Sequence, residues 1–341
     1  MTIFRWLLII LLVIGFALAG FLGLRATESA PKLGEQKTKG LTLSLDFNKN
    51  TYVLGEPIIA HLVMSNRSEV QVEDLWFSYG RDFYLSLENQ AGQPIGMQFI
   101  FTQKEQLITD WIKSLRAGET VTTSLDLTRG DPMAKEATLP KIATGTYYSK
   151  GRISGYVISP GTYRLIAVHD LYKHKLTHHE LIRLKVSKEF TVRAPEGREK
   201  EALALFETQA FFSGEGAEES QKIALAAYDK IWNEYRATAF AQYALYYSAR
   251  ILQTQGKLSE AEAKYSLLLE QFPDFPLLAD ALYYQTLVER ALKQSDKAQK
   301  SALKLREKFK NHLVSPDFPM KNRAKGSRVR ILLKDMGLED E

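Results

Sequence analysis

Four histidines within eleven residues form the densest group of potential metal ligands in the chain. Imidazole nitrogens and carboxylates at this spacing can coordinate zinc or another divalent ion. The segment also joins two predicted strands, where a solvated hairpin loop with incidental histidines is the ordinary explanation. The second interpretation is favoured, and no metal site is predicted. The residues are His169, Asp170, His174, His178, His179 and Glu180.

No local pattern of a nucleophilic or phosphate-binding site is present. The sequence lacks a Gly-x-Ser-x-Gly elbow, a His-Glu-x-x-His pair and a glycine loop ahead of Lys-Ser/Thr. It also has no cysteine, which excludes disulfides, thiolate metal sites and cysteine nucleophiles. A site assembled from distant residues leaves no local trace, so an unrecognised enzyme stays an alternative. The prediction is a protein that is not an enzyme and has no cofactor.

The elements that would position a binding surface lie in the C-terminal half, where the sequence repeats itself. Ala244-Leu245-Tyr246-Tyr247 recurs as Ala281-Leu282-Tyr283-Tyr284, at an offset of 37 residues. Self-similarity at such a period is typical of helix pairs that stack and bury their apolar faces against one another. We therefore expect a helical array over residues 198–313, and binding as its mode of action.

This repeat resembles the tetratricopeptide repeat, as found in bacterial envelope proteins. Ala261, Tyr265 and Pro273 occupy the places of the small residue, the aromatic and the closing proline of the second helix, and Ala249 that of the small residue on the first. In this family the first helices line a concave groove that holds peptides. The alternative is that one tyrosine of each pair packs between helices. The resemblance implies these groove residues: Tyr243, Tyr246, Arg250, Gln253, Asp280, Tyr283, Leu287 and Arg290.

Short strands separated by turns fill residues 41–193. Leu41 to Phe47 alternates apolar and polar residues, the period of a sheet with one buried face. Many such segments without helical periodicity favour an antiparallel sandwich. Pro160-Gly161-Thr162-Tyr163 is similar to the tyrosine corner of immunoglobulin-like domains, whose hydroxyl bonds back to the chain. The domain therefore resembles the immunoglobulin-like sandwiches of bacterial secreted and surface proteins.

The N-terminal segment is apolar enough to span a membrane. Trp6 to Leu24 contains 19 residues without a charge, between Arg5 and Arg25. A bilayer-spanning helix needs about 20 apolar residues, so a signal anchor is predicted over residues 1–25 and a polar linker over 26–40. A cleaved signal peptide is the alternative. Either interpretation places the bulk of the chain outside the cytoplasm, periplasmic or extracellular.

Basic residues accumulate near the C-terminus. The 341-residue chain has a formal net charge of +5, and twelve Lys or Arg residues face four acids between Asp296 and Asp335. A basic capping helix and tail are predicted over residues 314–341. Its charge is interpreted as a solvated helix face or as a site for an acidic partner or anionic lipid, and not for nucleic acid.

Together these patterns predict a multidomain fold, all-β followed by all-α: a membrane helix, an immunoglobulin-like antiparallel β-sandwich and a tetratricopeptide-like α-solenoid. The predicted function is that of a non-catalytic, membrane-anchored envelope scaffold that binds a partner protein or peptide through the groove. One alternative makes the sandwich the active binding or inhibitor module and the helices its support.

Overall fold

A computed structural model describes residues 40–77, 83–95, 110–127, 148–149, 152–153, 158–172, 181–207, 217–310, 312–313 and 328–338. No helix within these ranges is long and apolar enough to cross a bilayer. The predicted anchor over residues 1–25 lies outside them. The prediction of a membrane anchor, and of the membrane-anchored location that depended on it, is therefore corrected: among the described residues no helix could span a membrane.

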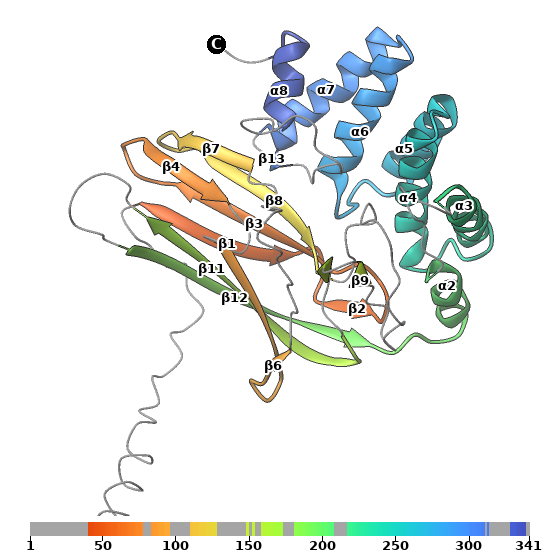
Figure 1. Ribbon diagram of the computed structural model, residues 1–341, viewed down its shortest axis with the longest axis horizontal. Helices are drawn as coiled ribbons and strands as arrows, with labels where there is room; N and C mark the ends of the chain where they lie inside the picture. The colour runs from red at the N-terminus through yellow and green to blue at the C-terminus, as the bar shows by residue number, and fades with distance from the viewer. Residues whose placement is uncertain are drawn as a thin grey trace, which may run out of the picture. The chain divides into compact units, whose positions relative to one another are not determined.

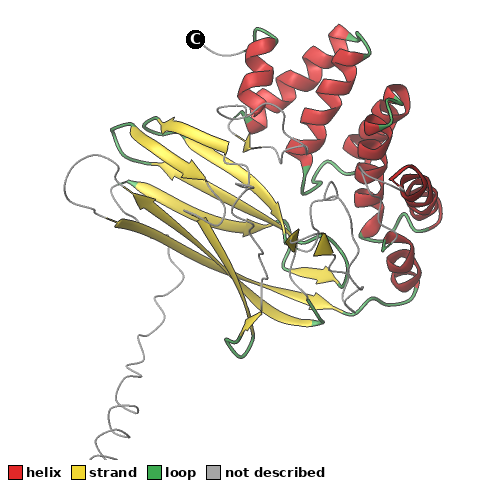
Figure 2. Cartoon of the chain, in the orientation of Figure 1, coloured by secondary structure: helices red, strands yellow, loops and turns green. Residues whose placement is uncertain are grey.

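Most of the described strands form two main sheets (Figures 1 and 2). A four-stranded sheet has the order β1-β3-β8-β13 and a five-stranded sheet the order β2-β12-β11-β5-β6, while β4 with β7 and β9 with β10 form two-stranded ladders. The strands are β1 Leu41–Phe47, β2 Thr51–Val53, β3 Ile59–Asn66, β4 Val72–Phe77, β5 Phe83–Asn89, β6 Pro94–Ile95, β7 Asp110–Leu115, β8 Thr120–Asp126, β9 Tyr148–Ser149, β10 Arg152–Ile153, β11 Gly161–Tyr172, β12 Leu181–Arg193 and β13 His312–Leu313.

An aromatic cluster joins the two main sheets in one apolar core. The Phe190 ring on β12 lies 5.0 Å from that of Phe47 on β1 and 5.7 Å from that of Tyr163 on β11, centroid to centroid. Tyr52 adds an edge-to-face contact with Phe190 at 6.1 Å. Such pairs contribute about 0.5–1.5 kcal/mol beyond the area they bury. The alternation predicted for residues 41–47 is present from Leu43 onward, because Ser44 and Asp46 are exposed between the buried Leu43, Leu45 and Phe47.

Tyr163 forms the hydrogen bond to a preceding residue that its resemblance to a tyrosine corner predicts. Its hydroxyl donates to the carbonyl of Ser159 at 2.7 Å and accepts from the amide of the same residue at 3.1 Å. The contact holds the entry to β11 against the preceding loop.

Antiparallel helices follow the strands. β12 ends at Arg193 and the first described helix begins at Arg198, at the boundary expected from Ala194 to Gly197. The helices are α2 Arg198–Phe206, α3 Ala217–Glu234, α4 Phe240–Thr254, α5 Leu258–Gln271, α6 Leu278–Ala291, α7 Ser295–Phe309 and α8 Arg328–Asp335. The two copies of Ala-Leu-Tyr-Tyr lie at equivalent places in α4 and α6.

Two ion pairs join neighbouring helices of the array. Lys264 on α5 pairs with Asp229 on α3 at 2.6 Å, and Lys297 on α7 pairs with Glu262 on α5 at 3.0 Å. Each pair joins residues 35 apart in sequence. The two ion pairs link α3 to α5 and α5 to α7, but they are displaced by 33 residues and so do not follow the 37-residue repeat.

The turns that follow α4 and α6 are also equivalent. Gly256 has a φ of 73° and Lys293 a φ of 59°, both in the left-handed region. In each turn the amide of the next residue donates, at 2.9 Å, to the carbonyl five residues before it. This pattern is the Schellman closure of a helix C-terminus, which favours glycine at the left-handed position. The first copy has that glycine and the second copy does not.

The helices and the sheets share a core. Val53 and Ile59 from the strands belong to the apolar cluster of the helices, and the Tyr243 hydroxyl on α4 donates to the carbonyl of Pro57 at 3.1 Å. Gly55, with a φ of +83°, lies so close to α2 that a Cβ atom there would be 2.2 Å from Cδ1 of Leu203.

A strand from the C-terminal part also enters the four-stranded sheet. β13, which follows α7, pairs in parallel with β8 through His312 and Thr122. Arg330 on α8 forms an ion pair with Glu119 in the turn before β8.

The predicted fold class, an all-β domain followed by a separate all-α domain with a membrane helix, is therefore wrong. The described residues form a mixed α/β arrangement. The strand after α7, β13, pairs with part of the edge of β8, and the helices pack against Val53 and Ile59. The sheets are also not purely antiparallel, since β2 pairs in parallel with β12 and β13 with β8.

Candidate functional site

Half of the predicted groove lies in the core. Tyr243 and Asp280 are 0% and 2% exposed, and Tyr246 and Arg250 are 7% and 9% exposed. These four side chains cannot line an open groove in this structure. The other four predicted groove residues keep some exposure: Gln253, Tyr283 and Leu287 are half-buried and Arg290 is exposed.

The buried tyrosines are held by contacts on several sides. Tyr243 bonds to Pro57, and its ring lies 5.4 Å from that of Phe275. Tyr246 packs on the same phenylalanine at 5.4 Å and on Tyr247 at 5.3 Å. Burial raises the pKa of both Tyr243 and Tyr246 well above the usual range of a phenol. Their hydroxyls are consequently protonated, structural groups.

The two buried charges of the predicted groove also have partners within the molecule. The Arg250 guanidinium lies 3.5 Å from the ring centroid of Tyr284, in a cation–π contact between α4 and α6. The Asp280 carboxylate on α6 lies 3.5 Å from Nε2 of His312 on β13. The α6 helix is thus tied to the strand that enters the sheet, which the sequence repeat did not indicate.

The accessible half of the groove follows one face of α6. Tyr283, Leu287 and Arg290 lie at i, i+4 and i+7, so their side chains occupy one stripe of the helix. Tyr283 and Leu287 pack against the helical core with part of their surface, while Arg290 is exposed. Tyrosine and arginine are the residue types that dominate binding energy at protein interfaces. We refer to these three residues as the α6 stripe.

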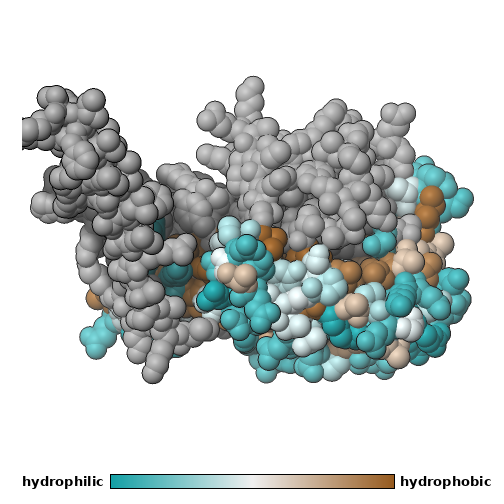
Figure 3. Space-filling model, turned by 90° about the horizontal axis from the view of Figure 1, so that it is seen from below, coloured by the Kyte–Doolittle hydropathy of each residue, from teal (hydrophilic) through white to brown (hydrophobic). Residues whose placement is uncertain are grey.

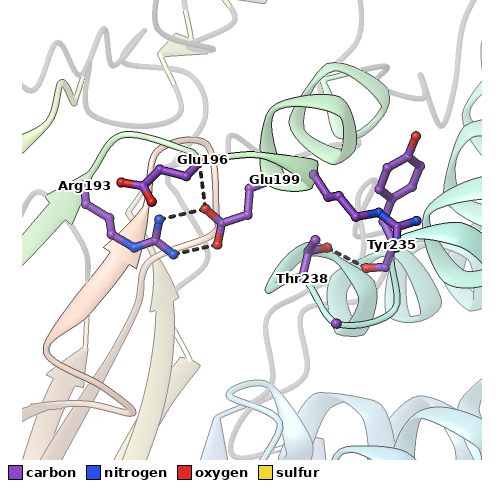
Figure 4. Close-up of a pocket in the computed structure, with 7 residues that line it drawn as sticks. Arg193, Glu196, Glu199, Tyr235 and Thr238 are labelled. Carbon is purple, nitrogen blue, oxygen red and sulfur yellow. Dashed lines mark hydrogen bonds and ion pairs between the residues drawn. The ribbon is translucent and has the colours of Figure 1, made fainter.

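A pocket of about 390 Å³ lies where β12, α2 and the turn between α3 and α4 meet (Figure 4). The Arg193 guanidinium forms two bonds to the Glu199 carboxylate, at 2.7 and 2.5 Å. This pairing lowers the pKa of Glu199 and raises that of Arg193. The lining residues are Arg193, Glu196, Arg198, Glu199, Tyr235, Ala237 and Thr238.

The polar groups of this pocket bond to one another. Thr238 donates its hydroxyl to the carbonyl of Tyr235 at 2.7 Å, and the Tyr235 hydroxyl donates to Glu201 at 2.8 Å, which raises the pKa of that phenol. Arg198 lies 5.1 Å from the centroid of the Tyr235 ring and donates to the carbonyl of Glu234. The hydroxyls of Thr238 and Tyr235 and the carboxylate of Glu199 are thus all used in bonds within the protein. Sequence reasoning missed this pocket, because its residues come from both sides of the domain boundary.

The histidine cluster is described only in part. His169 on β11 is fully buried, whereas His174, His178, His179 and Glu180 lie outside the described residues. Within the described ranges, no three His, Cys, Asp or Glu side chains come together as a metal site would require.

The basic C-terminal segment uses several of its charges internally. Lys297 pairs with Glu262 and Arg330 with Glu119, and Arg306 donates to the carbonyl of Leu338 at 3.2 Å. Residues 314–327 lie outside the described part of the chain. Some of the basic side chains of this segment therefore stabilise the fold through contacts within the protein.

The described surface shows no single apolar patch. Among the described large hydrophobic residues, Val70, Ile223 and Leu303 are exposed, and they lie in the β3–β4 turn, on α3 and on α7. Singly exposed hydrophobic residues are normal on a protein surface. On the face seen in Figure 3 the described residues are predominantly hydrophilic.

Comparisons with known proteins give no family. No protein-family model and no curated protein sequence matches the chain. A β-glucosidase from Listeria innocua in complex with laminaribiose is similar at 15% identity, with 45% of this chain and 16% of that chain covered and a TM-score of 0.23. The complex of that enzyme with glucose gives 14% identity, coverage of 50% and 19%, and a TM-score of 0.23.

The sporulation control protein Spo0M from Bacillus subtilis is similar at 11% identity, with 50% of this chain and 56% of that chain covered and a TM-score of 0.21. This chain spans less than a fifth of the β-glucosidase and about half of Spo0M. Neither likeness is close enough to indicate a fold or an activity. The tetratricopeptide, immunoglobulin-like and membrane assignments made from the sequence receive no support and are not retained.

Proposed function

We propose that this protein is a non-catalytic binding protein, and that the α6 stripe of Tyr283, Leu287 and Arg290 contacts a segment of a partner protein. The observation that carries the proposal is a difference in side-chain burial among the residues of the predicted groove. Tyr243, Tyr246 and Arg250 on α4 and Asp280 at the start of α6 are buried, while the α6 stripe keeps accessible surface. A half-buried tyrosine and leucine beside an exposed arginine provide apolar area and directed hydrogen bonds at one place.

The polar groups described elsewhere support a binding role over catalysis. The pocket beside Arg193 and Glu199 contains closed ion pairs and hydrogen bonds. The buried pair of Asp280 and His312 joins α6 to a strand and is 3% exposed on both sides. Groups with these partners stabilise the fold, whereas the α6 stripe keeps accessible surface among the described residues.

The test is binding of partners captured from native material by the full chain. The full chain is needed because helices and strands share a core, so that neither half is expected to fold alone. R290E and Y283A are compared with R116E, which reverses an exposed arginine in the turn between β7 and β8. A hot-spot residue is worth about 2 kcal/mol or more, so each α6 variant should weaken binding about thirtyfold.

R116E should bind the partner as tightly as the unmodified chain. Equal binding by all three variants would show that the α6 stripe is not the contact surface. Circular dichroism of each variant verifies that the helices remain folded, which matters most for Y283A because that ring packs partly on the core.

A further inference from the structure

Three lysines form a row on the exposed side of α7, the helix that packs between α6 and α8 (Figure 1). Lys300, Lys304 and Lys308 are exposed and lie at i, i+4 and i+8, so their side chains follow one another along the helix. Within the part of the chain that the structure describes, none of the three ammonium groups has an ion pair or a hydrogen bond. We refer to these three residues as the α7 row.

The basic character of α7 is not shared by the corresponding helices before it. α7 contains five basic and two acidic residues, which gives a net charge of +3. α3 contains two basic and four acidic residues, and α5 contains one basic and three acidic residues, so each has a net charge of −2. At the places of the α7 row, 37 residues earlier, α5 has Ala263, Leu267 and Gln271. Helix packing in this array therefore does not require lysine at these places.

The acids nearby leave the charge of the α7 row uncompensated. Asp296 and Glu307 are exposed on the same helix, but neither forms an ion pair with a described lysine. Glu262 on α5 is already paired with Lys297, at 3.0 Å. Like charges at i and i+4 destabilise a helix, and only Lys308, in the last turn, is favoured by the helix dipole. The row therefore costs helix stability without a compensating contact in the described structure.

The surroundings of the α7 row restrict the kind of anion that it fits. Leu303, 37% exposed, lies three residues after Lys300 and is the large apolar side chain on this side of the helix. Phe309, the one aromatic residue of α7, packs partly on the helical core. The exposed side of α7 thus has too little apolar area to insert into a bilayer, and it offers no ring on which bases could stack. Carboxylates of a protein segment fit this surface best.

The spacing of the lysines matches that of acidic side chains on an extended chain. Successive lysines of the α7 row are separated by four residues, which is about 6 Å along a helix. Alternate residues of an extended chain lie about 6.6–6.8 Å apart and point to the same side. Glutamate or aspartate at every second position of such a segment can therefore meet the three ammonium groups in turn.

We propose that the α7 row binds an acidic, extended segment of a partner protein, and that Leu303 adds an apolar contact beside the charges. The competing explanation is that the lysines form a polar cap, which keeps the last helices of the array soluble and binds nothing. The proposal does not depend on the α6 stripe, because it rests on other residues and its test changes none of the three in that stripe.

The test uses a short fluorescein-labelled peptide in which glutamate alternates with serine, and fluorescence anisotropy with the full chain at low salt. An exposed ion pair changes affinity by about twofold, so K300Q/K304Q/K308Q should weaken binding about tenfold. Salt of about 1 M, where the Debye length is about 3 Å, should abolish binding to the unmodified chain. Glutamine is used in place of glutamate because Lys304 acts on the buried Glu289, whose pKa is already raised by burial.

Two further variants separate the α7 row from the overall charge of the protein. K200Q/K222Q/K230Q removes three exposed lysines of α2 and α3 and leaves the same net charge, so it should bind the peptide as tightly as the unmodified chain. K300R/K304R/K308R retains the charges of the row and should also retain binding. Circular dichroism of each variant verifies that the helices are folded.

Four results would each overturn the proposal. The first three are no binding of the glutamate peptide, equal weakening by the two triple glutamine variants, and equally tight binding of a peptide with glutamine in place of glutamate. The fourth is binding to phosphatidylserine vesicles that requires the α7 row and is not inhibited by the glutamate peptide, because it would show that the ligand is a lipid surface.

Discussion

The turn after α6 provides a prediction about stability that depends on the repeat. Lys293 is the one non-glycine residue at positive φ in the described part of the chain, and Gly256 occupies the equivalent place after α4. Both turns close their helix with the same hydrogen bond. Replacing Lys293 with glycine should therefore stabilise the protein, and replacing Gly256 with lysine should destabilise it by a similar amount.

The size of the expected change in the free energy of unfolding follows from two opposing terms. A side chain with a Cβ in the left-handed region costs about 1–2 kcal/mol. Glycine loses more conformational freedom on folding, which costs about 0.5–1 kcal/mol relative to other residues. The difference predicts that Lys293→Gly raises the free energy of unfolding by about 0.5–1 kcal/mol, since Lys293 is exposed and has no packing to lose. The reverse change, Gly256→Lys, should lower it by about the same amount.

Urea denaturation of the full chain, followed by circular dichroism at the helical band, measures both changes. Lys300→Gly is the control, because Lys300 is exposed within α7, where glycine should cost about 1 kcal/mol. Lys293→Gly must therefore have the opposite sign to Lys300→Gly. A loss of stability in Lys293→Gly would show that the two turns are not equivalent.

Other variants test the contact between the helices and the strands, and the buried charge beside it. In urea denaturation, Gly55→Ala should lower the free energy of unfolding by about 1 kcal/mol more than Gly92→Ala. Both glycines have positive φ, but only the Cβ at position 55 would meet Leu203. Equal losses of stability would disprove that close approach. Lys49→Met leaves the buried Glu56 carboxylate without its ion-pair partner at 2.5 Å. The free energy of unfolding at neutral pH should therefore fall by about 2 kcal/mol. This loss is smaller than that for a fully buried ion pair, because Lys49 is one-third exposed. Burial raises the pKa of Glu56, so its contribution is complete below the unfolded value of 4.5 and is lost as the pH rises through the folded value. Glu56→Gln should therefore gain stability relative to the parent between about pH 4.5 and about pH 7, and an unchanged difference would contradict this.

The sequence predicted the elements whose patterns are local. The alternation at Leu41 to Phe47 corresponds to β1, and the turn before Tyr163 led to its bond with Ser159. The recurrence of Ala-Leu-Tyr-Tyr identified α4 and α6 as equivalent helices. In each case neighbours in sequence make the contact that the pattern implies, so no knowledge of distant packing is needed.

The parts that were missed depend on distant contacts. Tyr243 was predicted to face a groove, but it bonds to Pro57, which precedes it by 186 residues. The strand at His312 has only two residues, too few for any period, and is defined by the β8 edge that it meets. A repeat predicts that helices stack, but not which part of the chain covers their inner face.

The accessibility of individual tyrosines tests most directly the claim that α4 faces the strands while the α6 stripe stays accessible. Nitration of the folded full chain with tetranitromethane at mildly alkaline pH, followed by tandem mass spectrometry, assigns each modified ring. Tyr283 should be modified, whereas Tyr243 and Tyr246 should react only after unfolding, because burial excludes the reagent and raises the pKa of both phenols. Modification of Tyr243 or Tyr246 in the folded protein as fast as that of Tyr283 would contradict the account.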